Sequence, residues 1–220
     1  MTQTSRRPDA ELKGAVVEEL RATPSVNSTH IGVAVTDGAV TLSGEVETYP
    51  EKTLAEKAAQ RVRGVTAIAE EITVRDTWGA ADTDIAREAG EALQRAVDVP
   101  DTVKAAVHGH VVTLSGVVAW QYQRAGAARA VRYLKGVLDV LDTVTIRPTA
   151  AVADIKAAIG AALVRNARIE NQHIAVTTGT AGAVTLEGTV HSWAERRQAE
   201  QAAWSAPGVT EVTNHLRIDL

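Results

Sequence analysis

A basic segment with aromatic residues at its start lies in the middle of the chain. Between positions 117 and 136 the sequence has no acidic residue and four basic ones: Arg124, Arg129, Arg132 and Lys135. Trp120 and Tyr122 stand just before them. At about 100° per residue, the four cations of a helix over this segment fall within an arc of about 140°. Basic side chains attract anionic headgroups and aromatic rings sit at the membrane interface, so this composition indicates a face that binds an anionic phospholipid surface.

The same residues fit a second interpretation, in which the basic face is simply solvated. Trp120 and Tyr122 would then pack between neighbouring parts of the chain rather than meet a ligand. An exposed Trp120 beside Arg124 and Lys135 favours the membrane, whereas a buried Trp120 favours packing. Trp193 and Trp204 are candidates for the same two roles.

Catalytic and metal-binding motifs are not evident. The chain has no cysteine, which excludes thiolate chemistry and disulfides. His108 and His110 flank a turn glycine and offer two metal ligands, but no third ligand accompanies them, so a solvent-exposed turn is the favoured interpretation. We therefore predict no catalytic residue, no metal site and no bound cofactor.

A repeat organises the whole chain. The sequence Val-Thr-Leu-x-Gly occurs three times, and its glycines are evenly spaced along the chain: Gly44, Gly116 and Gly188. A Gly-Val pair follows each motif glycine at the same distance every time, with its glycine at Gly64, Gly136 and Gly208. A fixed period indicates one small unit used three times. We predict units at residues 1–76, 77–148 and 149–220, packed on one another because units of this size are marginally stable alone.

Each unit has the pattern of two helices and three strands. In the first unit Leu12, Val16 and Leu20 have helical spacing behind Asp9, which we expect to cap that helix. Two alternating strands joined by Asp37-Gly38 indicate a hairpin. An alanine-rich second helix is expected to end at the Gly-Val glycine, in a left-handed conformation. A last strand closes the unit. The predicted fold class is α+β, with three tandem α-β-β-α-β units, each a three-stranded mixed sheet with two helices on one face.

These motifs resemble the BON domain, a family named for the osmotically inducible bacterial protein Y and nodulation proteins. The resemblance covers nearly the whole chain as three copies. The family often has asparagine in its last strand, where this chain has Glu70, Asp142 and Asn214. The resemblance implies an α-β-β-α-β fold, no catalytic activity, and roles in envelope integrity and osmotic stress. Phospholipid-surface binding is the usual mechanistic proposal for the family, and chaperone-like activity is another.

Net charge and the hydropathy of the N-terminal segment limit the classes of partner and the cellular compartment that we expect. The net charge is −4, so we expect no nucleic-acid partner, since phosphate attraction needs a concentrated basic footprint. The polar start lacks an apolar signal region, which predicts a cytoplasmic protein, or a periplasmic one if a signal was removed, as most family members are periplasmic.

The predicted function is that of a non-enzymatic, stress-related protein of three BON-like units. It would bind anionic phospholipid, or another anionic surface, mainly through the second unit. The alternative is a chaperone-like or scaffolding protein that binds other proteins through sheet edges or grooves between units. An enzyme ranks third, and the oligomeric state is left open.

Overall fold

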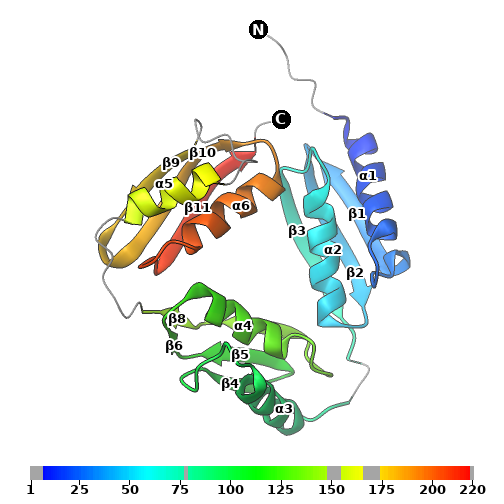
Figure 1. Cartoon of the computed structure of the whole chain (residues 1–220). Helices are drawn as coiled ribbons and strands as arrows, with labels where there is room; N and C mark the ends of the chain where they lie inside the picture. The colour runs from blue at the N-terminus through cyan, green and yellow to red at the C-terminus, as the bar shows by residue number, and fades with distance from the viewer. Residues whose placement is uncertain (1–6, 77–78, 148–154, 166–173, 219–220) are drawn as a thin grey trace.

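The computed structural model describes residues 7–76, 79–147, 155–165 and 174–218, which form three units of the predicted α+β type (Figure 1). The boundaries predicted between units fall within or beside residues 77–78 and 148–154, which lie outside the described residues. The first unit contains α1 (Asp9–Ala22), a 3₁₀-helix (Ser28–His30), β1 (Ile31–Thr36), β2 (Ala39–Val46), α2 (Tyr49–Arg61) and β3 (Ala67–Val74).

The other two units repeat this order. The second contains α3 (Asp82–Arg95), β4 (Lys104–His108), β5 (Val111–Ser115), β6 (Val117–Val118), α4 (Gln121–Val131), β7 (Asp139–Asp142) and β8 (Thr145–Ile146). The third contains α5 (Ile155–Arg165), β9 (Ile174–Thr178), a 3₁₀-helix (Thr180–Gly182), β10 (Ala183–Val190), α6 (Trp193–Trp204) and β11 (Glu211–Ile218).

The sheet of each unit is mixed, as predicted. In the first unit the order is β1-β2-β3, where β2 is antiparallel to β1 and parallel to β3. The third unit has the order β9-β10-β11 with the same directions. In the second unit the sheet β4-β5-β7 is continued by a short parallel pair, β6 and β8.

The core of each unit lies between the sheet and its two helices. The predicted helical stripe of α1, Leu12, Val16 and Leu20, is buried to 1% exposure or less, and it packs with Val40 and Leu42 of β2. The inner face of α2 is made of alanines, which lets that helix lie close to the sheet. Removing the side chain of a buried leucine such as Leu42 would cost about 2–5 kcal/mol.

The motif glycine is required by the backbone. Gly44 lies at φ +126° in β2, paired with Ile31 of β1, and a Cβ there would collide with the carbonyl oxygen of His30. Gly116 has φ +134° and the same relation to Thr102. The expectation for the Gly-Val glycine was wrong in one respect: α2 ends at Arg61, so Gly64 turns the chain toward β3 after the helix has already ended.

The aspartate at the start of the first helix clamps the hairpin turn. The predicted hairpin turn is present, its residues Asp37 and Gly38 both have positive φ, and their backbone N–H groups donate to the Asp9 carboxylate at 2.8 and 3.1 Å. Asp82 accepts from Gly109 and His110 in the same way, at 2.8 and 2.9 Å. The prediction that Asp9 caps its own helix was wrong, because the N-cap residue is Pro8, without a side-chain bond.

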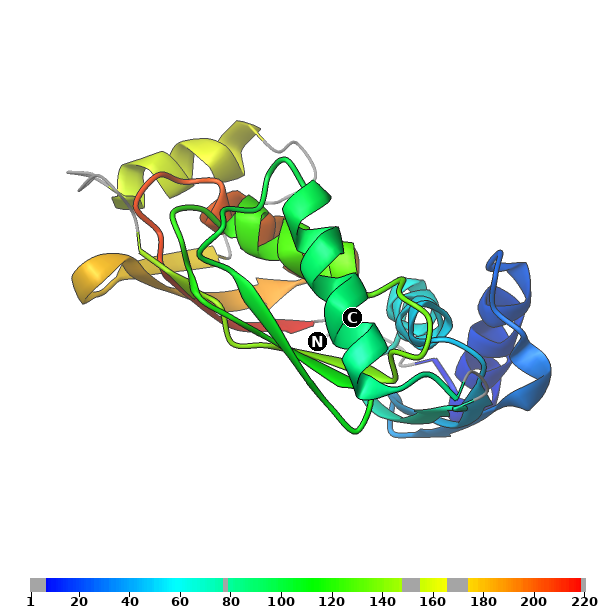
Figure 2. The ribbon, with the colours of Figure 1, turned by 90° about the horizontal axis from the view of Figure 1, so that it is seen from below.

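The three units lie at the corners of a triangle, with α2, α4 and α6 on its inner side and α1, α3 and α5 farther out (Figure 1). Figure 2 looks onto the second unit, with α3 foremost and α4 behind it. Two tryptophans of α6 join the units. The Trp193 indole packs on the core of the first unit and donates to the Val65 carbonyl at 3.0 Å, while Trp204 packs on the cores of the second and third units. Both therefore lie at junctions between units.

Candidate anion-binding surface of the second unit

The helix α4 starts differently from its counterparts. The N-cap hydroxyls of Thr48 and Ser192 accept a hydrogen bond from the third residue of α2 and α6, at 3.3 and 3.2 Å. The corresponding residue in the second unit is Trp120, whose indole can only donate. A missing cap of this kind costs about 1 kcal/mol. The other half of the cap is common to all three units: the side-chain oxygen of Gln123 accepts from the N–H groups of Ala119 and Trp120, as Glu51 accepts from Glu47 and Glu195 accepts from His191.

An exposed apolar rim surrounds this helix start. Trp120 is 39% exposed and Tyr122 is 58% exposed, and Val117, three residues before Trp120 in β6, is also exposed. We call these three residues the α4 rim. The structure thus places the side chains of Trp120 and Tyr122 at the surface.

Arg124 is paired with an acidic residue of its own unit. Its Nε lies 2.8 Å from Asp142, and the two side chains are only 30% and 25% exposed. The same arrangement recurs in the first unit, where Lys52 is 2.9 Å from Glu70. In the third unit, Arg196 donates to the carbonyl oxygen of Asn214. The charge of Arg124 is therefore offset within the fold.

The residues at the asparagine position of the last strand share one backbone role. The side-chain oxygens of Glu70, Asp142 and Asn214 each accept from the N–H two residues further on, at 2.6, 3.0 and 3.1 Å. The acidic residues in the first two units therefore replace the asparagine without loss of this bond.

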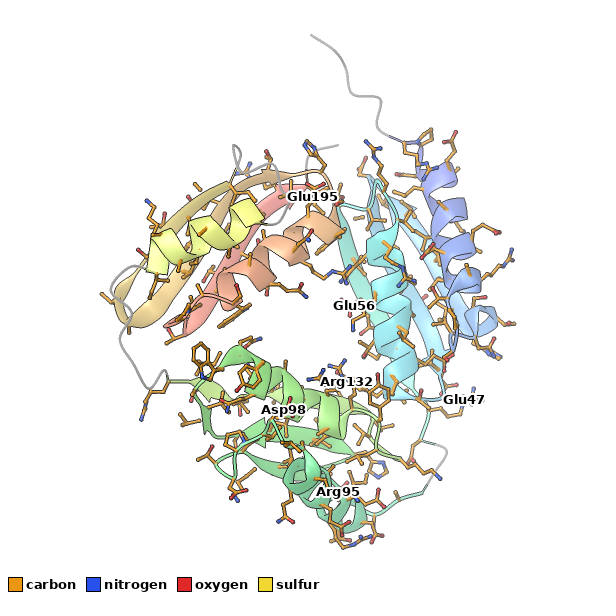
Figure 3. The ribbon with its side chains drawn as sticks, in the orientation of Figure 1. Glu47, Glu56, Arg95, Asp98, Arg132 and Glu195 are labelled. Atoms are coloured by element: carbon orange, nitrogen blue, oxygen red, sulfur yellow. The ribbon has the colours of Figure 1, made fainter. Side chains whose placement is uncertain are left out.

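The remaining cations of the segment point in different directions. Arg129 is exposed and lies 3.5 Å from Asp98. The helix ends at Val131, so the prediction of one helical face that includes Lys135 was wrong. Arg132 lies at the end of α4 nearest to α2 (Figure 3). Lys135 follows the helix and lines a cavity of about 490 Å³ between the first two units, together with Tyr49 and Tyr133.

The electrostatics of this cavity are perturbed by burial. Burial raises the pKa of Tyr49, the Asp139 carboxylate adds to the rise, and Arg132 opposes it. Because Asp139 and Arg132 belong to the second unit and Tyr49 to the first, charges of the second unit act on the ionisation of Tyr49 at this cavity.

The histidine turn contains a different cluster. His110 Nδ1 is 3.8 Å from Asp76, and His110 Nε2 is 4.0 Å from Asp82. The backbone N–H groups of His110 and Gly109 donate to Asp82 and lower the pKa of its carboxyl. Within the described ranges, no group of three His, Cys, Asp or Glu side chains is placed to hold a metal ion.

Sequence reasoning missed the acidic partners of the basic segment. Asp142 was within reach, since it follows Arg124 at the same distance along the chain as Glu70 follows Lys52. No spacing in the sequence predicts the pair of Asp98 with Arg129, because this pair depends on how the loop after α3 packs on α4.

Comparison with known proteins assigns the repeat. The BON domain matches residues 8–76, 81–148 and 151–219. The chain belongs to the BON-domain family. A curated relative, osmotically-inducible protein Y of Escherichia coli (strain K12), is 34% identical over 119 residues. This match spans 49% of the chain and 57% of the relative.

Solved structures add little to this assignment. The C-terminal domain of CdsD, a structural protein of the type III secretion system of Chlamydia trachomatis, covers the whole chain with 15% identity and a TM-score of 0.27. A second CdsD structure covers 95% of the chain with a TM-score of 0.26. At such scores the likeness carries no argument about this BON-domain chain. No helix among the described residues is long and apolar enough to cross a membrane.

Proposed function

We propose that this BON-domain protein is non-enzymatic and attaches peripherally to anionic phospholipid surfaces through the α4 rim of its second unit. The observation that carries the proposal is Trp120, an exposed indole at a helix N-cap. Its two counterparts are capping hydroxyls, so the second unit lacks a stabilising bond that the other units have. An exposed aromatic residue that lowers the stability of its own unit is explained by a contact with a partner outside the chain.

The aromatic side chains supply the apolar part of this contact. Trp120 and Tyr122 present amphipathic rings that suit the level of the lipid headgroups, and Val117 extends the apolar area. All three belong to a short stretch around the start of α4. The rim therefore offers a compact point of insertion and not a long amphipathic face.

Arg129 supplies the electrostatic part. It follows Tyr122 on α4 by about two helical turns, which places both side chains on the same helix face. Its side chain is 66% exposed and its pair with Asp98 is long at 3.5 Å, and exposed pairs of this kind are worth about 0–1 kcal/mol. A basic residue near an anionic membrane gains about 1 kcal/mol, so a lipid phosphate competes with Asp98. Binding is therefore weak and sensitive to salt.

The family match agrees with this proposal at a coarser level. The chain resembles an osmotically inducible relative, which supports a stress-related role. The resemblance to this relative also favours the periplasmic alternative for the compartment.

Co-sedimentation with vesicles tests the proposal. The wild type should pellet with anionic vesicles and not with zwitterionic ones, and moderate salt should release it. Tyr122→Glu removes an exposed ring and adds a negative charge, so pelleting should fall by about tenfold or more. The matched control is Leu141→Glu, since Leu141 is 55% exposed and alternates with residues of β7 that face the helices.

The control separates a specific contact from a general charge effect. Both variants lose a similarly exposed apolar side chain and gain one negative charge. Equal loss of pelleting in both, or a wild type that ignores anionic vesicles at low salt, would refute the assignment of the rim.

A second candidate function is chaperone-like or scaffolding binding of other proteins. The cavity between Tyr49 and Tyr133 favours it, because aromatic side chains there face a groove between two units. Suppression of aggregation of a model client by the wild type, lost in Tyr133→Ser and retained in Tyr122→Glu, would support this function and not the lipid contact.

A further inference from the structure

The inner helices carry two kinds of cation. Most have a partner within their own unit: Lys52 with Glu70, Arg61 with Glu19, Arg124 with Asp142, Arg129 with Asp98, and Arg196 with backbone carbonyls of Leu216 and Asn214. Lys57 of α2, Arg132 at the end of α4 and Arg197 of α6 differ. No carboxylate among the described residues lies within 4.0 Å of their charged atoms.

These three cations come from three units but share one region. The helices that carry them form the inner side of the triangle (Figure 1), and Arg132 lies where α4 approaches α2 (Figure 3). All three side chains are partly buried. The Nε atom of Arg132 is fully buried and has no hydrogen-bond partner. A buried guanidinium N–H without an acceptor is costly, which indicates a place for an acceptor that is not part of the chain.

The two arginine charges act on Lys57. Burial lowers the pKa of Lys57, and the charges of Arg132 and Arg197 lower it further. Glu56 opposes this shift, but its carboxylate accepts from Gln60 at 3.0 Å and is not paired with Lys57. Like charges that converge in a partly dehydrated region repel one another unless an anion lies between them.

We propose that Lys57, Arg132 and Arg197 form a binding site for a soluble multivalent phosphate, such as pyrophosphate, which links the three units. Guanidinium groups bind phosphate oxygens in bidentate fashion, and a lysine adds a compact charge, so this set of donors suits a phosphate better than a carboxylate-bearing metabolite with one charge. Each unit contributes one donor, and the site exists only when the triangle is assembled.

This inference goes beyond the proposed lipid contact. Lys57 and Arg197 belong to the first and third units, away from the α4 rim of the second. The phosphate chemistry is shared with lipid headgroups, so the test includes both a soluble phosphate and vesicles.

Titration calorimetry of the full chain with pyrophosphate, at ionic strength matched with sodium chloride, tests the site. Wild-type protein should bind one pyrophosphate per chain. Lys57→Gln and Arg197→Gln should each weaken binding by about tenfold. The matched controls are Lys13→Gln and Arg95→Gln, which remove exposed cations of α1 and α3 and should bind as the wild type does.

The outcomes separate this site from the rim. Pyrophosphate binding that Lys57→Gln and Arg197→Gln weaken, with vesicle pelleting intact in both, supports the proposal. Absence of pyrophosphate binding by wild type, or equal weakening in the control variants, overturns it. If both variants lose vesicle pelleting and the wild type ignores pyrophosphate, the cluster binds headgroups and the proposal is also overturned.

Discussion

Replacement of the first motif glycine by alanine should destabilise the protein strongly. Gly44 sits in the central strand β2 at φ +126°, between Ile31 of β1 and Ile72 of β3. A Cβ at this position points at the backbone carbonyl oxygen of His30 and lies 3.4 Å from the Cα of Ile31. The atoms that this Cβ would meet belong to the backbone, which cannot move aside as a flexible side chain does.

The magnitude follows from two costs. An alanine held in this region of φ carries strain of about 1–3 kcal/mol. Displacement of the start of β1 adds the loss of at least one hydrogen bond of the ladder, about 1 kcal/mol. We expect Gly44→Ala to lower the free energy of unfolding by about 3 kcal/mol in total.

Gly14→Ala is the matched control in the same unit. Gly14 lies inside α1, and a Cβ there meets no atom within 4 Å. The same chemical change should therefore raise stability by about 0.5–1 kcal/mol, because alanine favours the helix. Urea denaturation of the full chain, followed by circular dichroism, measures both. A Gly44→Ala variant within about 0.5 kcal/mol of wild type would refute the argument from close backbone approach.

Three further predictions concern the contacts that hold the units and their turns. Backbone donors lower the pKa of the Asp82 carboxyl, so its contribution to stability is full above the ordinary aspartate pKa and disappears as pH falls through the folded value. Asp82→Asn should therefore be less stable than wild type at pH 7, and this difference should vanish in acid. Thermal melts between these pH values will show it. Arg124→Met should lower stability by about 1 kcal/mol, because it leaves the partly buried Asp142 without its partner. The same variant should leave vesicle pelleting nearly unchanged. A large loss of pelleting would show that Arg124 contacts lipid directly. Trp193→Phe keeps an aromatic ring but removes the hydrogen bond to Val65, so the junction of the first and third units should weaken by about 1 kcal/mol. Hydrogen exchange at the start of β3 will detect this weakening as faster opening. Unchanged exchange would contradict the claim that this bond stabilises the junction.

Short sequence patterns predicted the helices and turns of each unit, because side-chain burial and backbone geometry over a few residues determine these elements. The four-residue spacing of Leu12, Val16 and Leu20 can be buried only on one face of a helix, and Asp37-Gly38 takes up the positive φ values that a tight hairpin needs. The threefold recurrence of the motif then determined the order of elements in every unit. The ends of the helices were predicted less well, since Gly64 tolerates a left-handed turn without marking the last helical residue.

The binding surface could be predicted only in part, because it depends on contacts between distant segments. The exposure of Trp120 and Tyr122 agrees with their position at the start of a helix. The direction of Arg132 depends on how the second unit packs against α2, and the pairing of Arg129 depends on the loop that follows α3. A helical projection treats all cations of one face alike, whereas the fold assigns them different partners.

Site-specific labelling tests the rim most directly. The chain has no cysteine, so Tyr122→Cys can be labelled at one position with a fluorophore that reports the polarity of its surroundings. Leu141→Cys, labelled in the same way, serves as the control with matched exposure. The lipid contact predicts that anionic vesicles shift the emission of the label at position 122 to shorter wavelength and leave position 141 unchanged. No shift at position 122, or an equal shift at both positions, would contradict the assignment of the α4 rim as the membrane-binding surface.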